Sequence, residues 1–173
     1  MSNRTKRKVE QRLTIWAIVI VALGVGAFFF YDRQVSNRDR VFVQFKRVDG
    51  SNTATFRLEQ ALTPAVRQKG LMFRKPGELA QNDGMVFVFP EESDHSFWMK
   101  DTYLPLDMIF LDRDFRVVGV VPDVQPLSQK PKKVGLPSIA AVELNAGVAK
   151  RENIGLGAKL EIKSGKLELT EVR

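Results

Sequence analysis

Two carboxylates interrupt otherwise apolar stretches of this chain, and their position makes them candidates for chemistry. Asp107 stands between Leu106 and Met108, and Glu143 stands between Val142 and Leu144. Burying a carboxylate costs several kcal/mol unless it is paired or neutralised. Two such groups facing one cleft could perform acid–base hydrolysis. The favoured alternative is a structural ion-pair network, because structural networks perturb carboxylates as readily as active sites do.

Basic and amide side chains elsewhere in the chain could complete such a site. The expected counter-charges are Arg67, Arg74 and Lys100, and Asn145 follows Glu143 by two residues. Together with the two carboxylates they form a candidate polar site. It would either bind a small anionic or sugar-like ligand or fix loops onto a sheet.

The adjacent aromatic residues Phe97 and Trp98 form a candidate aromatic platform. Neighbouring residues on a strand face opposite ways, so one of them should enter the core. The other either offers a ring to a ligand or covers a second buried face. We expect burial of both, with Met72, Met85 and Met99 filling gaps.

Metal and thiol chemistry have little support in this composition. The chain has no cysteine, so disulfides and thiolate metal sites are excluded. His95 is its single histidine, which is too few for a histidine zinc site. No Gly-x-Ser-x-Gly motif is present. We therefore expect neither a metal nor a cofactor.

The N-terminal region predicts a membrane anchor. Leu13–Tyr31 contains no charged residue, and its 19 residues span about 28 Å as a helix, close to the thickness of the bilayer core. Residues 1–12 carry five basic residues and one acidic residue, and such a tail stays in the cytosol. We expect a signal-anchor helix in the lipid bilayer, a tether at residues 32–40, and an extracytoplasmic domain at residues 41–173. That domain would be periplasmic in a Gram-negative cell.

Two alternatives for this apolar segment are less favoured. A cleaved signal peptide would have a shorter apolar region, and Val25-Gly26-Ala27 is a poor cleavage site. A buried soluble helix would not be apolar on every face. The basic tail also accounts for +4 of the net charge of +7, so we do not expect nucleic-acid binding.

The remainder of the chain predicts a β-rich α+β domain. We expect a helix from Pro64 with Thr63 as its N-cap and Gly70 at its end. Apolar alternation and turn residues predict strands at 41–48, 53–60, 85–89, 96–100, 106–111, 116–121, 139–144, 158–162 and 167–172. Many short strands with one short helix suggest a small, partly closed barrel or two packed sheets.

Several runs of uncommon residues occur in a fixed order between residues 56 and 162. They are Gly70-Leu71-Met72-Phe73-Arg74, Phe97-Trp98-Met99-Lys100, Leu104-Pro105-Leu106-Asp107 and Glu143-Leu144-Asn145-Ala146-Gly147. This pattern resembles the family called domain of unknown function 192. The resemblance implies a fold and an N-terminal membrane or export segment, but no reaction. Asp101 stands where that family has Asn, and Gly157-Ala158 where it has Gly-Asp.

These observations favour a membrane-anchored extracytoplasmic module that binds a small ligand or an envelope protein without catalysis. The alternative is a hydrolase or carbohydrate-active enzyme that uses Asp107 and Glu143. An open cleft that holds Lys100 together with both carboxylates would favour the enzyme. A closed, dry network would favour the binding module.

Overall fold

The structure is a computed structural model that describes residues 40–167. The predicted anchor Leu13–Tyr31 and most of the last predicted strand, 167–172, lie outside the described residues. Neither helix within residues 40–167 has the length and apolar character that crossing a membrane requires.

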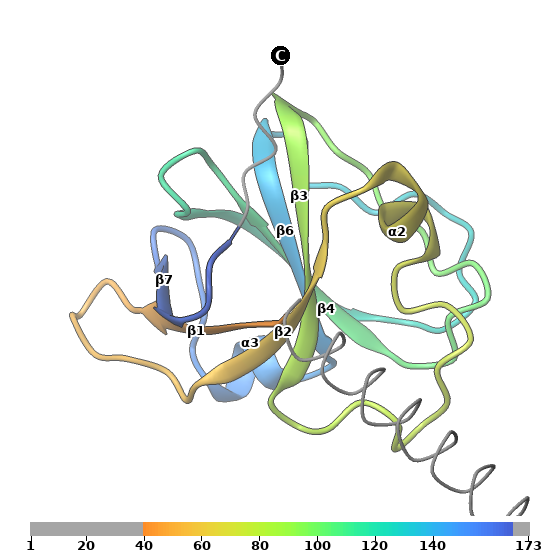
Figure 1. Cartoon of the computed structure of the whole chain (residues 1–173), viewed down its shortest axis with the longest axis horizontal. Helices are drawn as coiled ribbons and strands as arrows, with labels where there is room; N and C mark the ends of the chain where they lie inside the picture. Colours follow the sequence, from red (N-terminus) through yellow and green to blue (C-terminus); the bar gives the residue numbers. More distant parts are fainter. Residues whose placement is uncertain (1–39, 168–173) are drawn as a thin grey trace, which may run out of the picture. The chain divides into compact units, whose positions relative to one another are not determined.

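Seven strands form one sheet within the described residues (Figure 1). Its order is β5-β4-β6-β3-β2-β1-β7, and every neighbouring pair is antiparallel except β2 and β3. The strands are β1 (Arg40–Lys46), β2 (Phe56–Ala61), β3 (Asp83–Ser93), β4 (Leu106–Leu111), β5 (Val117–Val124), β6 (Ser138–Asn145) and β7 (Lys159–Ser164).

The sheet curls until its two edge strands meet at one corner. Arg116, just before β5, forms a β-bridge with Lys159 of β7. The N–H of Val117 donates to the carbonyl of Ala158 at 2.8 Å, and the N–H of Leu160 donates to Phe115 at 2.9 Å. The domain is therefore a curled half-barrel, which confirms the β-rich prediction and replaces the alternative of two packed sheets.

Each face of the central strands carries its own apolar cluster. The first cluster draws residues from all seven strands, among them Phe45, Phe56 and Ile109, and fills the inside of the curl. The second, which includes Phe87, Met108 and Phe110, lies on the opposite face of β3, β4 and β6. In Figure 1, helix α2 and its loops lie on one side of these strands, and β1 and β7 lie on the other.

Helix α2 (Pro64–Lys69) has the ends that the sequence predicts. The Thr63 hydroxyl accepts a hydrogen bond from the N–H of Val66 at 3.3 Å, and Gly70 has a φ of 48°. No residue of the helix is buried. A helix of this length is marginal alone, so tertiary contacts must hold it. A second short helix, α3 (Val148–Arg151), follows β6.

The structure corrects the prediction around residues 85–100. Strand β3 continues through Ser93, where the sequence suggested a loop from Pro90 to His95. Residues 96–100 are not a strand of the sheet. Phe97 exchanges two backbone hydrogen bonds with Lys132, at 2.8 and 2.7 Å, but Met99 donates to Ser128 instead. This segment packs over the second apolar cluster, which contains Met99 itself and has Phe97 packed against it.

Candidate functional site

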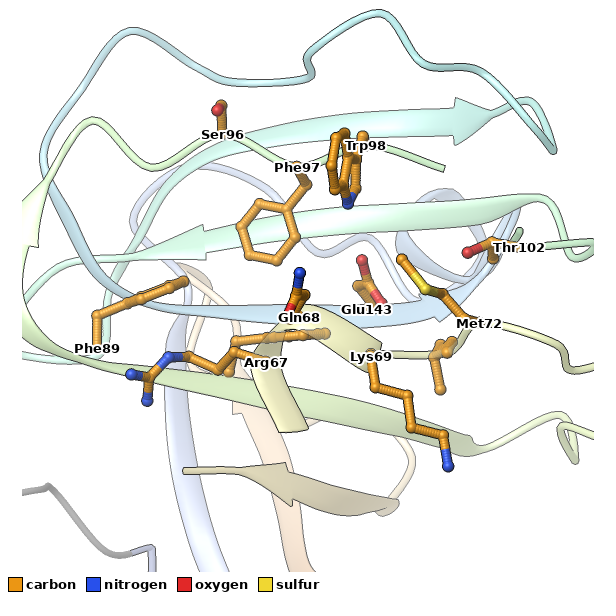
Figure 2. A pocket seen from close by; sticks show the side chains of 13 residues that line it. Arg67, Gln68, Lys69, Met72, Phe89, Ser96, Phe97, Trp98, Thr102 and Glu143 are labelled. Carbon is orange, nitrogen blue, oxygen red and sulfur yellow. The ribbon is translucent and has the colours of Figure 1, made fainter. Parts of the chain in front are cut away.

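A pocket of about 240 Å³ lies above the second face of the sheet, between the α2 region and residues 96–102 (Figure 2). Its floor comes from β3 and β6. Its walls are mainly apolar, with a few polar groups among them. The lining residues are Arg67, Gln68, Lys69, Gly70, Leu71, Met72, Phe87, Phe89, Ser96, Phe97, Trp98, Thr102 and Glu143.

Glu143 lies at the base of this pocket. In the register of the sheet it stands between Met85 of β3 and Met108 of β4, both members of the second apolar cluster. The residue is 5% exposed. Among the described residues, none donates a hydrogen bond to its carboxyl group or forms an ion pair with it. Its oxygens face the open space of the pocket, because Arg40 Nε is the one fully enclosed side-chain atom without a hydrogen-bond partner among the described residues.

The protonation of Glu143 follows from this burial. Desolvation disfavours the charged form and raises the pKa of Glu143 to about 8. The carboxyl group is therefore mostly protonated at neutral pH. In Figure 2 the charged ends of Arg67 and Lys69, which both line the pocket, point away from it.

Arg67 is held by backbone carbonyls rather than by a carboxylate. Its guanidinium donates to the carbonyl oxygens of Leu62 and Val88, at 2.5 and 2.9 Å. It also lies 5.7 Å from the centre of the Phe89 ring, within the range of a cation–π contact. Arg67 thus ties α2 to β3 and fixes one wall of the pocket.

Aromatic rings form the opposite wall. The Phe97 ring makes edge-to-face contacts with Phe87, at 5.0 Å between centroids, and with Phe110, at 5.6 Å. Trp98 remains 49% exposed, so the expected burial of both aromatic residues is wrong for Trp98. The Lys100 ammonium lies 5.8 Å from the centre of the Trp98 ring.

Asp107 lies on the opposite face of the sheet from Glu143. It pairs with Leu144, which belongs to the first apolar cluster, whereas Glu143 pairs with Met108 of the second. Directly paired residues share a face, and consecutive residues alternate between faces. The two carboxylates therefore do not converge on one substrate.

The Asp107 carboxylate has a structural partner on each oxygen. One oxygen accepts a hydrogen bond from the N–H of Asp123 and the other from the N–H of Ala149, both at 2.8 Å. Gly147, the N-cap of α3, offers no side-chain acceptor. Asp107 supplies that acceptor from β4, so its carboxylate anchors α3 and the end of β5.

The remaining predicted site residues are dispersed. Arg74 forms an ion pair with Glu59 at 2.5 Å, and Asn145 donates to the carbonyl of Ala80 at 2.9 Å. Among residues 40–167, neither the expected ion-pair network nor a cleft that combines Lys100, Asp107 and Glu143 is formed. No group of three or more His, Cys, Asp or Glu side chains there is arranged to hold a metal ion.

Several residues that line the pocket were not predicted as site residues from the sequence. Gln68 follows Arg67 on α2, and Thr102 lies in the segment that covers the second cluster. Met72, expected to fill the core, lines the pocket instead. The one available signal was their proximity to the runs Gly70–Arg74 and Phe97–Lys100, because the pocket is built between these two runs.

The comparison with protein families agrees with this arrangement. Residues 45–162 match the profile of DUF192, a family of uncharacterised proteins. This chain belongs to the DUF192 family. The match covers both runs that build the pocket, as well as Asp107 and Glu143. Among curated proteins, none matches the sequence.

Two solved structures are similar to this DUF192 chain. A protein from Sinorhizobium meliloti 1021, described as a proposed transcription regulator, is 33% identical with a TM-score of 0.68. The similarity covers 71% of this chain and 93% of that one. A protein of unknown function from Novosphingobium aromaticivorans is 37% identical with a TM-score of 0.63, and covers 70% of this chain and 84% of its own.

Replacing each carboxyl group by an amide should affect the stability of the fold differently at Asp107 and at Glu143. Asp107→Asn turns an amide N–H₂ towards one of two buried N–H donors, and should destabilise the fold by roughly 1–3 kcal/mol. Glu143→Gln removes a group that has no partner to lose, and should leave stability at pH 7 unchanged or raised. Urea unfolding midpoints of both variants measure the difference. Equal destabilisation by the two changes would contradict these assignments.

The pH dependence of unfolding distinguishes Glu143 further. Between its usual pKa of 4.5 and the folded value of about 8, the unfolded chain releases a proton that the folded protein keeps. Wild-type stability should therefore fall relative to Glu143→Gln as pH rises through this window, by at most about 5 kcal/mol. Glu161→Gln, on β7, is the matched control and should follow the wild type. A constant difference between wild type and Glu143→Gln would refute the raised pKa.

Proposed function

We propose that this protein is a ligand-binding domain tethered to the outer face of the cell membrane, and that its aromatic-walled pocket receives a small molecule. The observation that carries the proposal is the Glu143 carboxyl group, which lies buried at the base of the pocket without a partner among the described residues. A polar group kept in such a place lowers stability unless something binds it.

The form of the pocket supports a small ligand rather than an envelope protein. Its volume of about 240 Å³ lies just below the range typical of drug-sized ligands. Apolar walls with a few convergent polar groups are also the usual composition of small-molecule sites. Gln68, Thr102 and Glu143 supply those polar groups here.

A paired-carboxylate hydrolase has less support from this geometry. Glu143 is the one carboxyl group among the residues that line the pocket, and no imidazole lies among them. Asp107 faces the other side of the sheet, and both of its oxygens accept backbone hydrogen bonds. A general acid needs a base or nucleophile on the same substrate, and this pocket does not offer the expected one.

The membrane location rests on the N-terminal sequence. Leu13–Tyr31 is uncharged, and the basic residues before it favour a cytosolic N-terminus. The S. meliloti relative is described as a proposed transcription regulator. For this chain, +4 of the +7 net charge belongs to residues 1–12, so the charge supports contact with anionic lipid more than binding of DNA.

A reporter enzyme fused after Arg173 tests the orientation. Alkaline phosphatase in that position should be active in intact cells, because the domain and the reporter would lie outside the cytosol, and β-galactosidase in the same position should be inactive. The reverse pattern would place the domain in the cytosol. Substituting two residues of Leu13–Tyr31 by Lys provides the control, and should abolish phosphatase activity by preventing insertion.

The methionines offer a direct assay of ligand binding. Met72 lines the pocket, Met85 and Met108 flank Glu143, and Met99 belongs to the same cluster. In full-length protein reconstituted in nanodiscs with ¹³C-methyl methionine, a screen of small fragments should shift Met72, Met85 and Met108 together. The signal of Met1 serves as the reference and should stay unchanged.

Glu143→Gln should lower the affinity of the protein for the fragments found in this screen, and Glu161→Gln should leave that affinity unchanged. If no cationic, neutral or anionic fragment shifts these three methyl signals, the proposal that the pocket binds a small molecule is overturned.

A further inference from the structure

We infer that the ligand of this pocket is a small organic cation, an alkylammonium or arylalkylammonium ion, whose ammonium group lies against Glu143 and the rings of Phe97 and Trp98. The inference rests on the proposed function and names the class of ligand for the same site. It follows from three features of the pocket: the unpaired carboxyl group, the aromatic wall and the position of the protein's own cations.

The unpaired carboxyl group supplies the first argument. A buried carboxylate is stabilised most by an opposite charge held within hydrogen-bond distance. The cations nearest to the pocket are engaged elsewhere or directed away. Arg67 donates to two carbonyl oxygens, Lys100 lies over Trp98, and the Lys69 ammonium points away from Glu143 in Figure 2. The position of a counter-ion is thus left to a ligand.

The aromatic wall supplies the second argument. Rings attract cations through the negative charge of their faces. Two rings that line the pocket already do so, because Arg67 lies over Phe89 of the floor at 5.7 Å and Lys100 lies over Trp98 of the wall at 5.8 Å. In Figure 2, Phe97 and Trp98 stand over the Glu143 carboxyl group, with Met72 beside it. Aromatic rings recognise ammonium ions in proteins, and a carboxylate beside them would add an opposite charge.

Most of the other charged groups on or beside the pocket are basic, and their repulsion would oppose the binding of a cation. Arg67 and Lys69 line the pocket itself. The others belong to segments beside it: Lys100 lies over Trp98, Asp101 follows Lys100, the His95 ring stacks on Phe89, and the backbone of Lys132 pairs with Phe97. The residues of β3 and β4 that pair with Glu143 are Met85 and Met108, which carry no charge. Charges exposed at the mouth are screened over roughly 8–10 Å, whereas the buried carboxylate is not.

The inference predicts a coupling between ligand and protons. Glu143 has a pKa of about 8 in the unliganded protein, so at pH 7 most molecules must lose a proton when the cation binds. About 0.9 proton should be released per ligand at that pH. Affinity should rise by roughly 50-fold between pH 6 and pH 8, as the ionised fraction rises. A neutral ligand that accepts a hydrogen bond from the protonated acid would show the opposite trend.

Calorimetry on full-length protein in nanodiscs tests these statements, with benzylamine as the probe and benzyl alcohol as its neutral counterpart. Benzylamine stays protonated from pH 6 to pH 8, so changes in affinity report on the protein. Titrations in two buffers of different ionisation enthalpy count the released protons. We expect at least tenfold tighter binding of the amine at pH 8, with the proton release and pH trend given above. Glu143→Gln should abolish the proton release and the pH dependence of affinity, and Glu161→Gln should retain them.

The possible outcomes separate this inference from the proposed function. If neutral fragments shift the Met72, Met85 and Met108 signals while benzylamine does not bind, the cationic class is overturned and the pocket remains a binding site. If neither the neutral fragments nor benzylamine bind, both the cationic class and the proposed binding function are overturned. Affinity for benzyl alcohol that increases as pH falls, with no such increase for benzylamine, would assign the site to a neutral ligand. Tighter binding of N-acetyl-lysine methylamide than of benzylamine would assign it to a lysine side chain of a peptide.

Discussion

The central strands β3, β4 and β6 are covered on both faces, and this double burial constrains the rest of the domain. One face looks into the curled sheet, and the other is covered by the α2 region and the loops that follow it. Strand β4 is buried at every position, and β6 at all but its last. Any polar side chain in these strands must therefore find a partner or stay uncharged.

The two carboxylates in these strands meet that constraint in opposite ways. Asp107 accepts hydrogen bonds from two backbone N–H groups and anchors a helix that has no side-chain cap of its own. Glu143 has no such partner, and burial raises its pKa to about 8. The first arrangement is complete within the protein, whereas the second leaves a carboxyl group open to the pocket, where we propose that a ligand binds. This contrast is the reason to place function at Glu143.

Local patterns in the sequence predicted much of the fold, whereas the site depended on information that they do not contain. Alternation predicted β1, apolar runs bounded by turn residues predicted β4, β5 and β6, and Thr63 and Gly70 marked the ends of α2. The faces taken by Asp107 and Glu143 depend on the register between β4 and β6, in which Asp107 pairs with Leu144 and Met108 with Glu143. A shift of one residue would exchange the faces of a strand, and the sequence does not encode that register locally. The covering role of residues 96–102 could not be predicted from the sequence either, because a short apolar run fits a strand or a covering loop equally well.

The charge of Glu143 in the unliganded protein decides whether the pocket lacks a counter-ion. The carboxyl ¹³C shift of Glu143, followed by NMR from pH 4 to pH 9 in selectively labelled protein and assigned with Glu143→Gln, measures its pKa without any ligand. We expect a midpoint near the value of about 8 that burial imposes. A midpoint near the usual 4.5 would show that the protein already stabilises the carboxylate, and would contradict a site that waits for its partner.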